Sequence, residues 1–346
     1  MGEIRKDPIH NRWVIIADER KKRPHAFYRE LEEVSDKRKC PFCEGKEKKT
    51  PPEIDSFRVR GKPDEPGWRI RVVPNKYPAL NPEGFNPEGL SPKGKIRKIF
   101  DGLSYRYHGY GRHEVIIETP HHKKNLYNMD KEEISLIFSM YRKRYLYLKK
   151  DKNLKYILIF KNYGNIAGAS LPHSHSQVIG LPLIPPEIEE ELMAIKDSIK
   201  CPFCNFIQRA KDEERILERN KDFTVLAPYA PIAPYELVVY PLEHKPCFEE
   251  INDSEMDSLS EIIRDTFRRF NKLLENPPFN YFLHTSPTTP TAKIYKNYHW
   301  HIVIMPKLSL SAGFEMGSGI YINPVDPRKA VKELKEAKEY KEEVDE

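Results

Sequence analysis

The sequence predicts an α+β protein built from two related halves, each an antiparallel sheet with one helix, which together form one pseudo-duplicated unit. Three observations support this prediction: the same order of motifs occurs twice, apolar segments of strand composition recur at matching places, and each copy contains one long amphipathic pattern. A repeat of this kind is typical of a duplicated structural unit. We expect the first half to span residues 1–195 and the second to span residues 196–346.

Each half begins with the tetrapeptide CPFC, at 40–43 and at 201–204. In the first half follow HEVIIETPHH (113–122), YILIFKN (156–162) and HSHSQVI (173–179). In the second half follow YELVVYPLEH (235–244), YFLHTS (281–286) and HWHIVIM (299–305). These β-branched and aromatic segments, bounded by Gly, Pro or Asn, predict strands. The first half therefore carries HSHSQ, and the second carries a degenerate HWHIV.

Two amphipathic helices are predicted from apolar residues at a spacing of 3.6. The first begins at Asp130, where Glu133 completes a capping box, and the second begins at Ser254. Their apolar faces consist of Ile134, Ile137, Phe138, Tyr141, Tyr145 and Leu148, and of Met256, Leu259, Ile263, Phe267, Phe270 and Leu274. Segments 45–68 and 80–98, rich in Pro, Gly and Lys, predict long loops. The C-terminal segment predicts a charged helix with Val331 and Leu334 on its apolar stripe.

Composition favours a cytoplasmic globular protein. The chain has 346 residues, of which 39% are hydrophobic, and no apolar run reaches the length of a membrane span. The start, MGEIRKDPIHNRWVII, lacks the apolar region of a signal peptide. A net charge of +6, from 58 basic and 52 acidic residues, is a mild excess over a mixed surface. It suits an anionic small substrate, and neither a nucleic acid nor a membrane is expected as a partner.

Two structural zinc sites are predicted, one in each half. Five cysteines, four of them in two C-x-x-C pairs, favour metal ligation over disulfides. A structural zinc site is closed by four protein ligands, and each half offers two further histidines at matching places. His121 is a rival to His122, and Cys247 is expected to be a buried thiol. The proposed ligand sets are Cys40, Cys43, His122 and His173 for the first zinc, and Cys201, Cys204, His244 and His299 for the second, which could also hold iron.

The HSHSQ segment predicts the catalytic group. Side chains alternate along a strand, so His173, His175 and Gln177 share one face. With His173 assigned to the metal, His175 is left as a neutral imidazole able to attack phosphorus, and Gln177 can donate its amide N–H to a phosphoryl oxygen. In the second half the glutamine position holds Val303, so only the first half keeps this chemistry.

The segment KNYGNIAGAS, directly before HSHSQ, predicts an anion-binding loop. Glycines such as Gly164 and Gly168 permit close backbone approach to a phosphate. Asn162 and Ser170 can donate hydrogen bonds to its oxygens.

Taken together, these motifs resemble the galactose-1-phosphate uridylyltransferase family, within the histidine-triad superfamily. The resemblance also includes DPIHNRWVIIADERKKRP, VVPNKYPAL, ETPHH and YHWHIVIMPKL followed by AGFEMGSGIYINP, and so covers nearly the whole chain. It implies a double displacement: His175 attacks the α-phosphate of a nucleoside diphosphate sugar, expels hexose 1-phosphate and forms a nucleotidyl-histidine, which a second sugar phosphate resolves. Gln177 would stabilise this intermediate, with Ser170 and Asn162 at the phosphates.

The resemblance also implies further binding residues and a homodimer. Arg20 and Arg23 lie in the RKKRP segment that contacts phosphates in the family, and Asn75 and Tyr77 match its nucleotide-side motif. Glu315 lies in a segment that approaches the sugar across the dimer interface in family members.

This chain departs from well-known uridylyltransferases at several positions. They carry H-P-H-G-Q where this chain has H-S-H-S-Q, often have a carboxylate where it has Lys76, and lack a cysteine pair at the second metal site. The serines, the second CPFC and the GSGIYIN ending are more similar to the ADP-glucose phosphorylase branch, in which phosphate accepts the nucleotidyl group.

Three functions therefore remain open from the sequence. The favoured one is a UDP-glucose:hexose-1-phosphate (galactose-1-phosphate) uridylyltransferase. The second is an ADP-sugar phosphorylase or adenylyltransferase, distinguished by the nucleotide that labels His175. The third is a zinc-ribbon-like binding module, which would show salt-sensitive nucleic-acid binding and need neither His175 nor Gln177.

Overall fold

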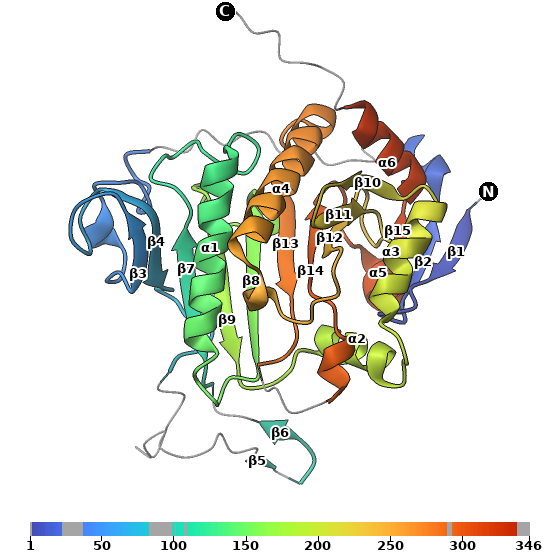
Figure 1. Cartoon of the computed structure of the whole chain (residues 1–346), viewed down its shortest axis with the longest axis horizontal. Coiled ribbons are helices and arrows are strands. Elements are labelled where there is room, and N and C mark those ends of the chain that lie inside the picture. Colours follow the sequence, from blue (N-terminus) through green and yellow to red (C-terminus); the bar gives the residue numbers. More distant parts are fainter. Residues whose placement is uncertain are drawn as a thin grey trace, which may run out of the picture.

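The structure, a computed structural model, describes residues 2–22, 37–82, 99–100, 102–106, 109–288 and 293–337. It confirms the predicted α+β class, with one large antiparallel sheet and helices packed on it (Figure 1). The strands of this sheet are β3 (Asp55–Arg58), β4 (Trp68–Pro74), β7 (Arg112–Ile117), β8 (Tyr156–Tyr163), β9 (His175–Leu181), β10 (Ile216–Arg219), β11 (Phe223–Leu226), β12 (Leu237–Pro241), β13 (Phe279–His284) and β14 (His301–Pro306). The longer helices are α1 (Lys131–Leu148), α2 (Pro186–Lys196), α3 (Pro202–Asp212), α4 (Asp253–Leu274) and α6 (Pro327–Glu336).

The internal repeat of the sequence is a repeat of strand order. The ten strands run β10-β11-β12-β14-β13-β8-β9-β7-β4-β3, so each half contributes five strands in the same order outward from the centre. The two five-stranded halves join where β8 pairs with β13, with Asn162 opposite Asn280. The sheet is therefore continuous across the repeat.

Both predicted helices are present, and each begins with a capping box. Asp130 accepts a hydrogen bond from the Glu133 backbone N–H at 2.9 Å, and the Glu133 side chain accepts from the Asp130 N–H at 3.0 Å. The cap of α4 is Asn252, so this helix begins one residue before the predicted Ser254. Figure 1 shows α1 and α4 lying side by side across one face of the sheet. Their apolar faces and the strand residues beneath them form the main core.

A second, smaller sheet ties the N-terminal segment to the C-terminal one. It consists of β1 (Glu3–Lys6), β2 (Trp13–Ile16) and β15 (Tyr321–Asn323), with β15 parallel to β2. The short helix α5 (Gly313–Ser318) precedes β15, and the 3₁₀ turn η1 (Asp18–Lys22) follows β2. A further hairpin joins β5 (Ile99–Phe100) to β6 (Tyr105–Arg106). In the described part of the chain, no helix has the length and apolar character needed to cross a bilayer.

The prediction of a loop over 45–68 is wrong in part. This segment contains β3 and the first residue of β4, joined as an edge hairpin. The four residues DSFR are too few, and too evenly half-buried, to show an alternating pattern among the surrounding Pro, Gly and Lys. Most of the other predicted loop, residues 83–98, lies outside the described residues. The terminal helix is confirmed as α6, with Val331 and Leu334 buried.

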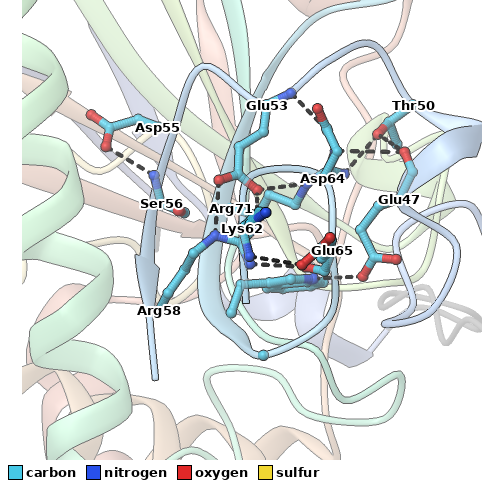
Figure 2. Close-up of polar contacts among 12 residues, drawn as sticks. Glu47, Thr50, Glu53, Asp55, Ser56, Arg58, Lys62, Asp64, Glu65 and Arg71 are labelled. Atoms are coloured by element: carbon cyan, nitrogen blue, oxygen red, sulfur yellow. Dashed lines mark hydrogen bonds and ion pairs between the residues drawn. The ribbon is translucent and has the colours of Figure 1, made fainter. Parts of the chain in front are cut away.

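Buried charges fasten the β3–β4 hairpin to the segment that follows the first cysteine pair (Figure 2). Arg71 is 1% exposed, and its guanidinium donates to Glu53 at 3.0 Å and to the Thr50 hydroxyl at 2.7 Å. The indole N–H of Trp68 donates to Glu47 at 2.8 Å. Because these acceptors all lie between residues 47 and 53, the hairpin fixes the chain directly after Cys43.

Replacing Arg71 with Met should lower the free energy of unfolding by about 3 kcal/mol, because it removes one of the two guanidinium groups that compensate the buried carboxylate of Glu53 and leaves only Arg58 there. Chemical denaturation with and without the substitution measures this. Arg69→Met on the same strand is the matched control: its ion pair with Glu132 is exposed, so the change should stay below about 1 kcal/mol. Equal effects of the two substitutions would contradict a stabilising role for the Arg71 network.

Candidate active site

His175 and Gln177 lie on the face of the sheet opposite α1. His175 opens β9 and pairs with Ile117 of β7, and Gln177 pairs with Val115. Because side chains alternate, these four residues share one face, while Val178 belongs to the core under the helices. The predicted alignment of the two functional residues on one face is therefore what the structure shows.

The ring of His175 is held in the tautomer that a nucleophile requires. The residue is 6% exposed, and its Nδ1 lies 2.8 Å from the carbonyl oxygen of His173. A carbonyl oxygen can only accept, so Nδ1 carries the proton and the lone pair is on Nε2. Burial lowers the pKa of His175, which keeps the imidazole neutral at neutral pH. The site thus presents an unprotonated Nε2 for attack.

The two serines of HSHSQ are hydrogen-bonded behind the strand. Ser174 donates to the carboxylate of Glu118 at 2.6 Å, and Ser176 also bonds to it. Lys161 forms an ion pair with Glu118 and donates to the His175 carbonyl at 3.2 Å. Burial opposes ionisation of Glu118, but Lys161 and the serine hydroxyls hold its pKa below the ordinary value. This network fixes the backbone on both sides of His175.

Gln177 is contacted by two side chains from neighbouring segments. Its Oε1 lies 2.8 Å from Nε2 of His113 and 3.4 Å from Nδ2 of Asn75. Tyr77, two residues further along, is 81% exposed, and its backbone N–H donates to Asn75. The structure therefore places Asn75 beside Gln177, and the ring of Tyr77 is exposed on the same loop.

The predicted anion loop lies at the end of β8. Gly164 and Gly168 have φ angles of 83° and 87°, in the region that favours glycine. Asn162 lies 3.5 Å from the Gly168 carbonyl and accepts a hydrogen bond from Asn280 at 2.8 Å. Ser170 is exposed at the end of the loop.

Two other predicted residues, Arg20 and Glu315, do not join this cluster. Arg20 lies in η1 and Glu315 in α5, both beside the small sheet, which Figure 1 shows at the opposite side of the molecule from β7 and β9. Among the described residues, no hydrogen bond or ion pair links either of them to His175 or Gln177. Arg23 lies outside the described residues.

The two predicted ligand sets converge as two tetrads. In the first, Sγ of Cys43 lies 3.3 Å from Nδ1 of His122 and 3.6 Å from Nδ1 of His173, and Sγ of Cys40 lies 3.5 Å from the latter. His122, not its rival His121, is the residue that faces the thiols.

The second tetrad repeats this arrangement. Nδ1 of His299 lies 3.5 Å from Sγ of Cys204 and 3.9 Å from Sγ of Cys201, and His244 lies 3.6 Å from Cys204. Cys247 stays outside it and contacts the Ser286 hydroxyl at 3.0 Å.

Both tetrads fit a zinc ion. Zinc–sulfur and zinc–nitrogen bonds of about 2.3 and 2.0–2.1 Å in a tetrahedron give sulfur-to-nitrogen distances of about 3.5 Å. The far ring nitrogens of the histidines donate to carbonyls: His173 to Thr119 at 2.7 Å, His299 to Pro241 at 3.0 Å and His244 to Lys296 at 2.7 Å. These bonds place the Nδ1 lone pairs toward the thiols, as metal ligation requires.

The first tetrad touches the nucleophile through Phe42. This ring, from the first CPFC, lies 5.3 Å from the His175 ring and 6.2 Å from the His173 ring, both edge-on. The second half repeats the contact, with Phe203 at 5.3 Å from His301. The cysteine segment thus packs directly against the histidine two residues after the metal-facing one.

The second half keeps the histidine and loses its surroundings. His301 donates through Nδ1 to the His299 carbonyl at 2.9 Å, as His175 does to His173. The carboxylate of Glu191, however, lies 3.6 Å from its Nε2 and 2.7 Å from His284. Glu191, His284 and His301 therefore form a buried carboxylate–histidine cluster. The carboxylate beside Nε2 of His301 would repel a phosphate.

The strand registers show what replaced the other active-site groups. Val303 stands where Gln177 stands, and Glu236 occupies the place of His113. These residues line a cavity of about 340 Å³. Burial raises the pKa of Glu236 to about 7, although the backbone N–H groups of Ile232 and Ala233 donate to it.

Replacing Glu236 with Gln should stabilise the protein above about pH 7 by up to about 3 kcal/mol. The unfolded carboxyl ionises near 4.5, whereas the folded one stays protonated until about 7. The wild type therefore loses stability across this window, and the variant does not. Denaturation midpoints at pH 4 and pH 8 measure the effect. A constant difference between the two proteins across this range would rule out a raised pKa.

Comparison with known proteins gives a consistent result. The family "Galactose-1-phosphate uridyl transferase, N-terminal domain" matches residues 2–185, and a domain of unknown function (DUF4921) matches residues 104–344. An ADP-glucose phosphorylase from Arabidopsis thaliana is 36% identical over 96% of this chain and 92% of its own. A galactose-1-phosphate uridylyltransferase from Thermotoga maritima is 27% identical over 96% and 98%.

Solved structures of similar proteins share the whole fold. The crystal structure of an ADP-glucose phosphorylase from Arabidopsis thaliana with bound ADP-glucose superposes with a TM-score of 0.79, at 34% identity over 97% of this chain and 98% of that one. A uridylyltransferase structure gives 0.72, at 25% identity over the same shares of the two chains.

Proposed function

This chain belongs to the galactose-1-phosphate uridylyltransferase family and is an enzyme of the nucleotidyltransferase type, and from that premise we propose that it works through a covalent nucleotidyl-His175. The observation that best supports this proposal is the bare Nε2 of His175, buried beside Gln177 on one face of the sheet. The same geometry disfavours a zinc-ribbon-like binding module, which has no use for a tautomer-fixed histidine.

The reaction proceeds in two displacements. Nε2 of His175 attacks the α-phosphorus of a nucleoside diphosphate hexose; the N–P bond forms as the bridging P–O bond breaks. Hexose 1-phosphate leaves with the bonding electron pair. An oxygen of the acceptor then attacks the same phosphorus and returns His175 to the neutral form. Gln177 donates its amide N–H to the phosphoryl oxygens as charge develops on them, with Asn162 and Ser170 at the flanking phosphate.

The first candidate reaction uses UDP-glucose as donor and hexose 1-phosphate, such as galactose 1-phosphate, as acceptor. The uridylyltransferase relatives support it. A second candidate uses ADP-glucose as donor and phosphate as acceptor. The 36% identity to an ADP-glucose phosphorylase favours it, together with the bonding of Ser174 and Ser176, which the H-P-H-G-Q motif cannot reproduce.

We propose zinc for both tetrads, with iron as the alternative in the second. When bound, the ion would act as a structural crosslink that holds four side chains at fixed places. In the first half, Phe42 packs against both the His173 ring and the His175 ring, so fixing the metal site also restrains the position of His175. Pairs of reduced thiols also agree with a cytoplasmic location.

A homodimer is part of the proposal. Arg20 and Glu315 lie beside the small sheet, near the other end of the large sheet from β7 and β9, and Figure 1 shows this separation. In a twofold dimer, the small-sheet end of one chain can complete the active site of its partner. Arg23, adjacent to the described part of η1, would belong to the same contribution.

Replacing His175 with Ala should reduce turnover by at least about 10³-fold, because no other group at the site can form the covalent intermediate. Steady-state assays with UDP-glucose and ADP-glucose measure it, with metal content checked in the same sample. The matched control is His121→Ala, an exposed histidine outside the tetrads. Activity within tenfold of wild type in the His175 variant would remove the proposed nucleophile.

Replacing Cys201 with Ser should lower the metal content by about one equivalent per chain and destabilise the second half, since structural zinc contributes about 10–16 kcal/mol of apparent binding energy. Elemental analysis and thermal unfolding measure the two effects. Cys247→Ser, at a thiol outside the tetrads, should leave the metal content unchanged. If both variants keep their metal, the assignment of the second ligand set is wrong.

A further inference from the structure

His113 lies beside Gln177 and contacts both the sheet and the loop that carries Asn75. It is the second residue of β7 and shares its face with Val115, diagonally opposite Gln177. Its backbone carbonyl accepts from the Asn75 N–H at 2.9 Å. Its ring is therefore enclosed between β9 and residues 75–79.

A backbone donor determines the protonation of this ring. The N–H of Ala79 donates to Nδ1 of His113 at 3.1 Å. Since a backbone N–H can only donate, Nδ1 must be the unprotonated nitrogen, and the proton is on Nε2. Nε2 in turn lies 2.8 Å from Oε1 of Gln177 and donates to it.

The same argument fixes the orientation of the amide of Asn75. The backbone N–H of Tyr77 donates to its Oδ1 at 2.8 Å, so its Nδ2 is on the side of Gln177 and His113, 3.4 Å from Oε1 of Gln177 and 3.1 Å from Nε2 of His113. Two donors therefore converge on one oxygen. A flipped Gln177 would place its NH₂ group against both of them, which costs the two hydrogen bonds and adds donor–donor repulsion.

We propose that His113 is a positioning residue that fixes the amide of Gln177 with its NH₂ group directed at the phosphoryl group. The backbone N–H groups of Tyr77 and Ala79 orient the side chains of Asn75 and His113. These two side chains in turn hold Oε1 of Gln177 in place. Within the described chain, the amide hydrogens of Gln177 have no protein acceptor, so both remain for phosphoryl oxygens. This inference rests on the proposed nucleotidyl transfer for its effect on rate, but not for the geometry itself.

Substitution of His113 separates the two contacts of its ring. Asn at this position can still accept from the Ala79 N–H but cannot reach Gln177. Gln can reach Gln177 with an amide N–H. His113→Asn should slow the single-turnover formation of nucleotidyl-His175 about 3- to 10-fold, the effect of one hydrogen bond, with donor Kd changed less than twofold. His113→Gln should restore at least half of the lost rate.

A double-substitution cycle tests the route of the effect. In a Gln177→Ala background, His113→Asn should change the rate by less than twofold, because the group that it positions is gone. An equal loss in both backgrounds, or a loss expressed mainly in donor Kd, would show that His113 acts on the fold or on binding and would overturn the proposal.

The tautomer can be measured without any substrate. Long-range ¹H–¹⁵N NMR of the ¹⁵N-histidine-labelled protein, with the His113 signals assigned from their loss in His113→Asn, should show a protonated Nε2 and a bare Nδ1. A protonated Nδ1 would contradict the proposal even if the enzyme is active. A wild type that forms no nucleotidyl adduct but shows the expected tautomer would instead count against the proposed function, with the positioning geometry intact.

Discussion

The buried ion pair between Lys161 and Glu118 is the interaction on which the active-site strand depends. Neither side chain is exposed, so the charges must be compensated by each other and by nearby dipoles. Glu118 takes up the hydroxyls of Ser174 and Ser176, and Lys161 bonds to the His175 carbonyl. Hydrogen bonds on the helix side of the sheet thus hold Ser174 and Ser176. The ring of His175 lies on the opposite face. This arrangement explains why serines flank His175 in HSHSQ: their hydroxyls bond to Glu118.

Duplication explains why the site is asymmetric on a symmetric scaffold. Both halves keep the cysteine pair, the metal-facing histidines and a histidine whose Nδ1 donates two residues back. They differ in what surrounds that histidine: an amide and two of its donors in the first half, and in the second the buried carboxylate of Glu191 and the buried carboxyl group of Glu236. The scaffold therefore persists where the phosphate chemistry is lost. A carboxylate near Nε2 is sufficient physical reason for that loss.

The sequence predicted what depends on local spacing. Hydrophobic periodicity predicted the two long helices, and the alternation of side chains along a strand predicted the shared face of His175 and Gln177. Motifs that occur in both halves predicted the central strands and both tetrads. It missed His113, Asn280 and the Lys161–Glu118 pair, since their roles depend on which strands are neighbours and in which register. It also missed β3, whose four residues carry no pattern, and α2 and α3, which were not predicted as helices. The resemblance assigned Asn75 to nucleotide binding, and the structure shows that it contacts Gln177, whereas Arg20 and Glu315 lie apart from the cluster in a single chain.

The central claim is a covalent nucleotidyl group on His175, and intact mass spectrometry tests it most directly. The purified enzyme is exposed briefly to UDP-glucose or to ADP-glucose without an acceptor, under conditions that preserve acid-labile P–N bonds. The account predicts one added nucleoside monophosphate per chain, located on His175, and the base of the adduct distinguishes the two candidate reactions. No adduct with either donor, in a preparation that contains both metals, would contradict the double displacement.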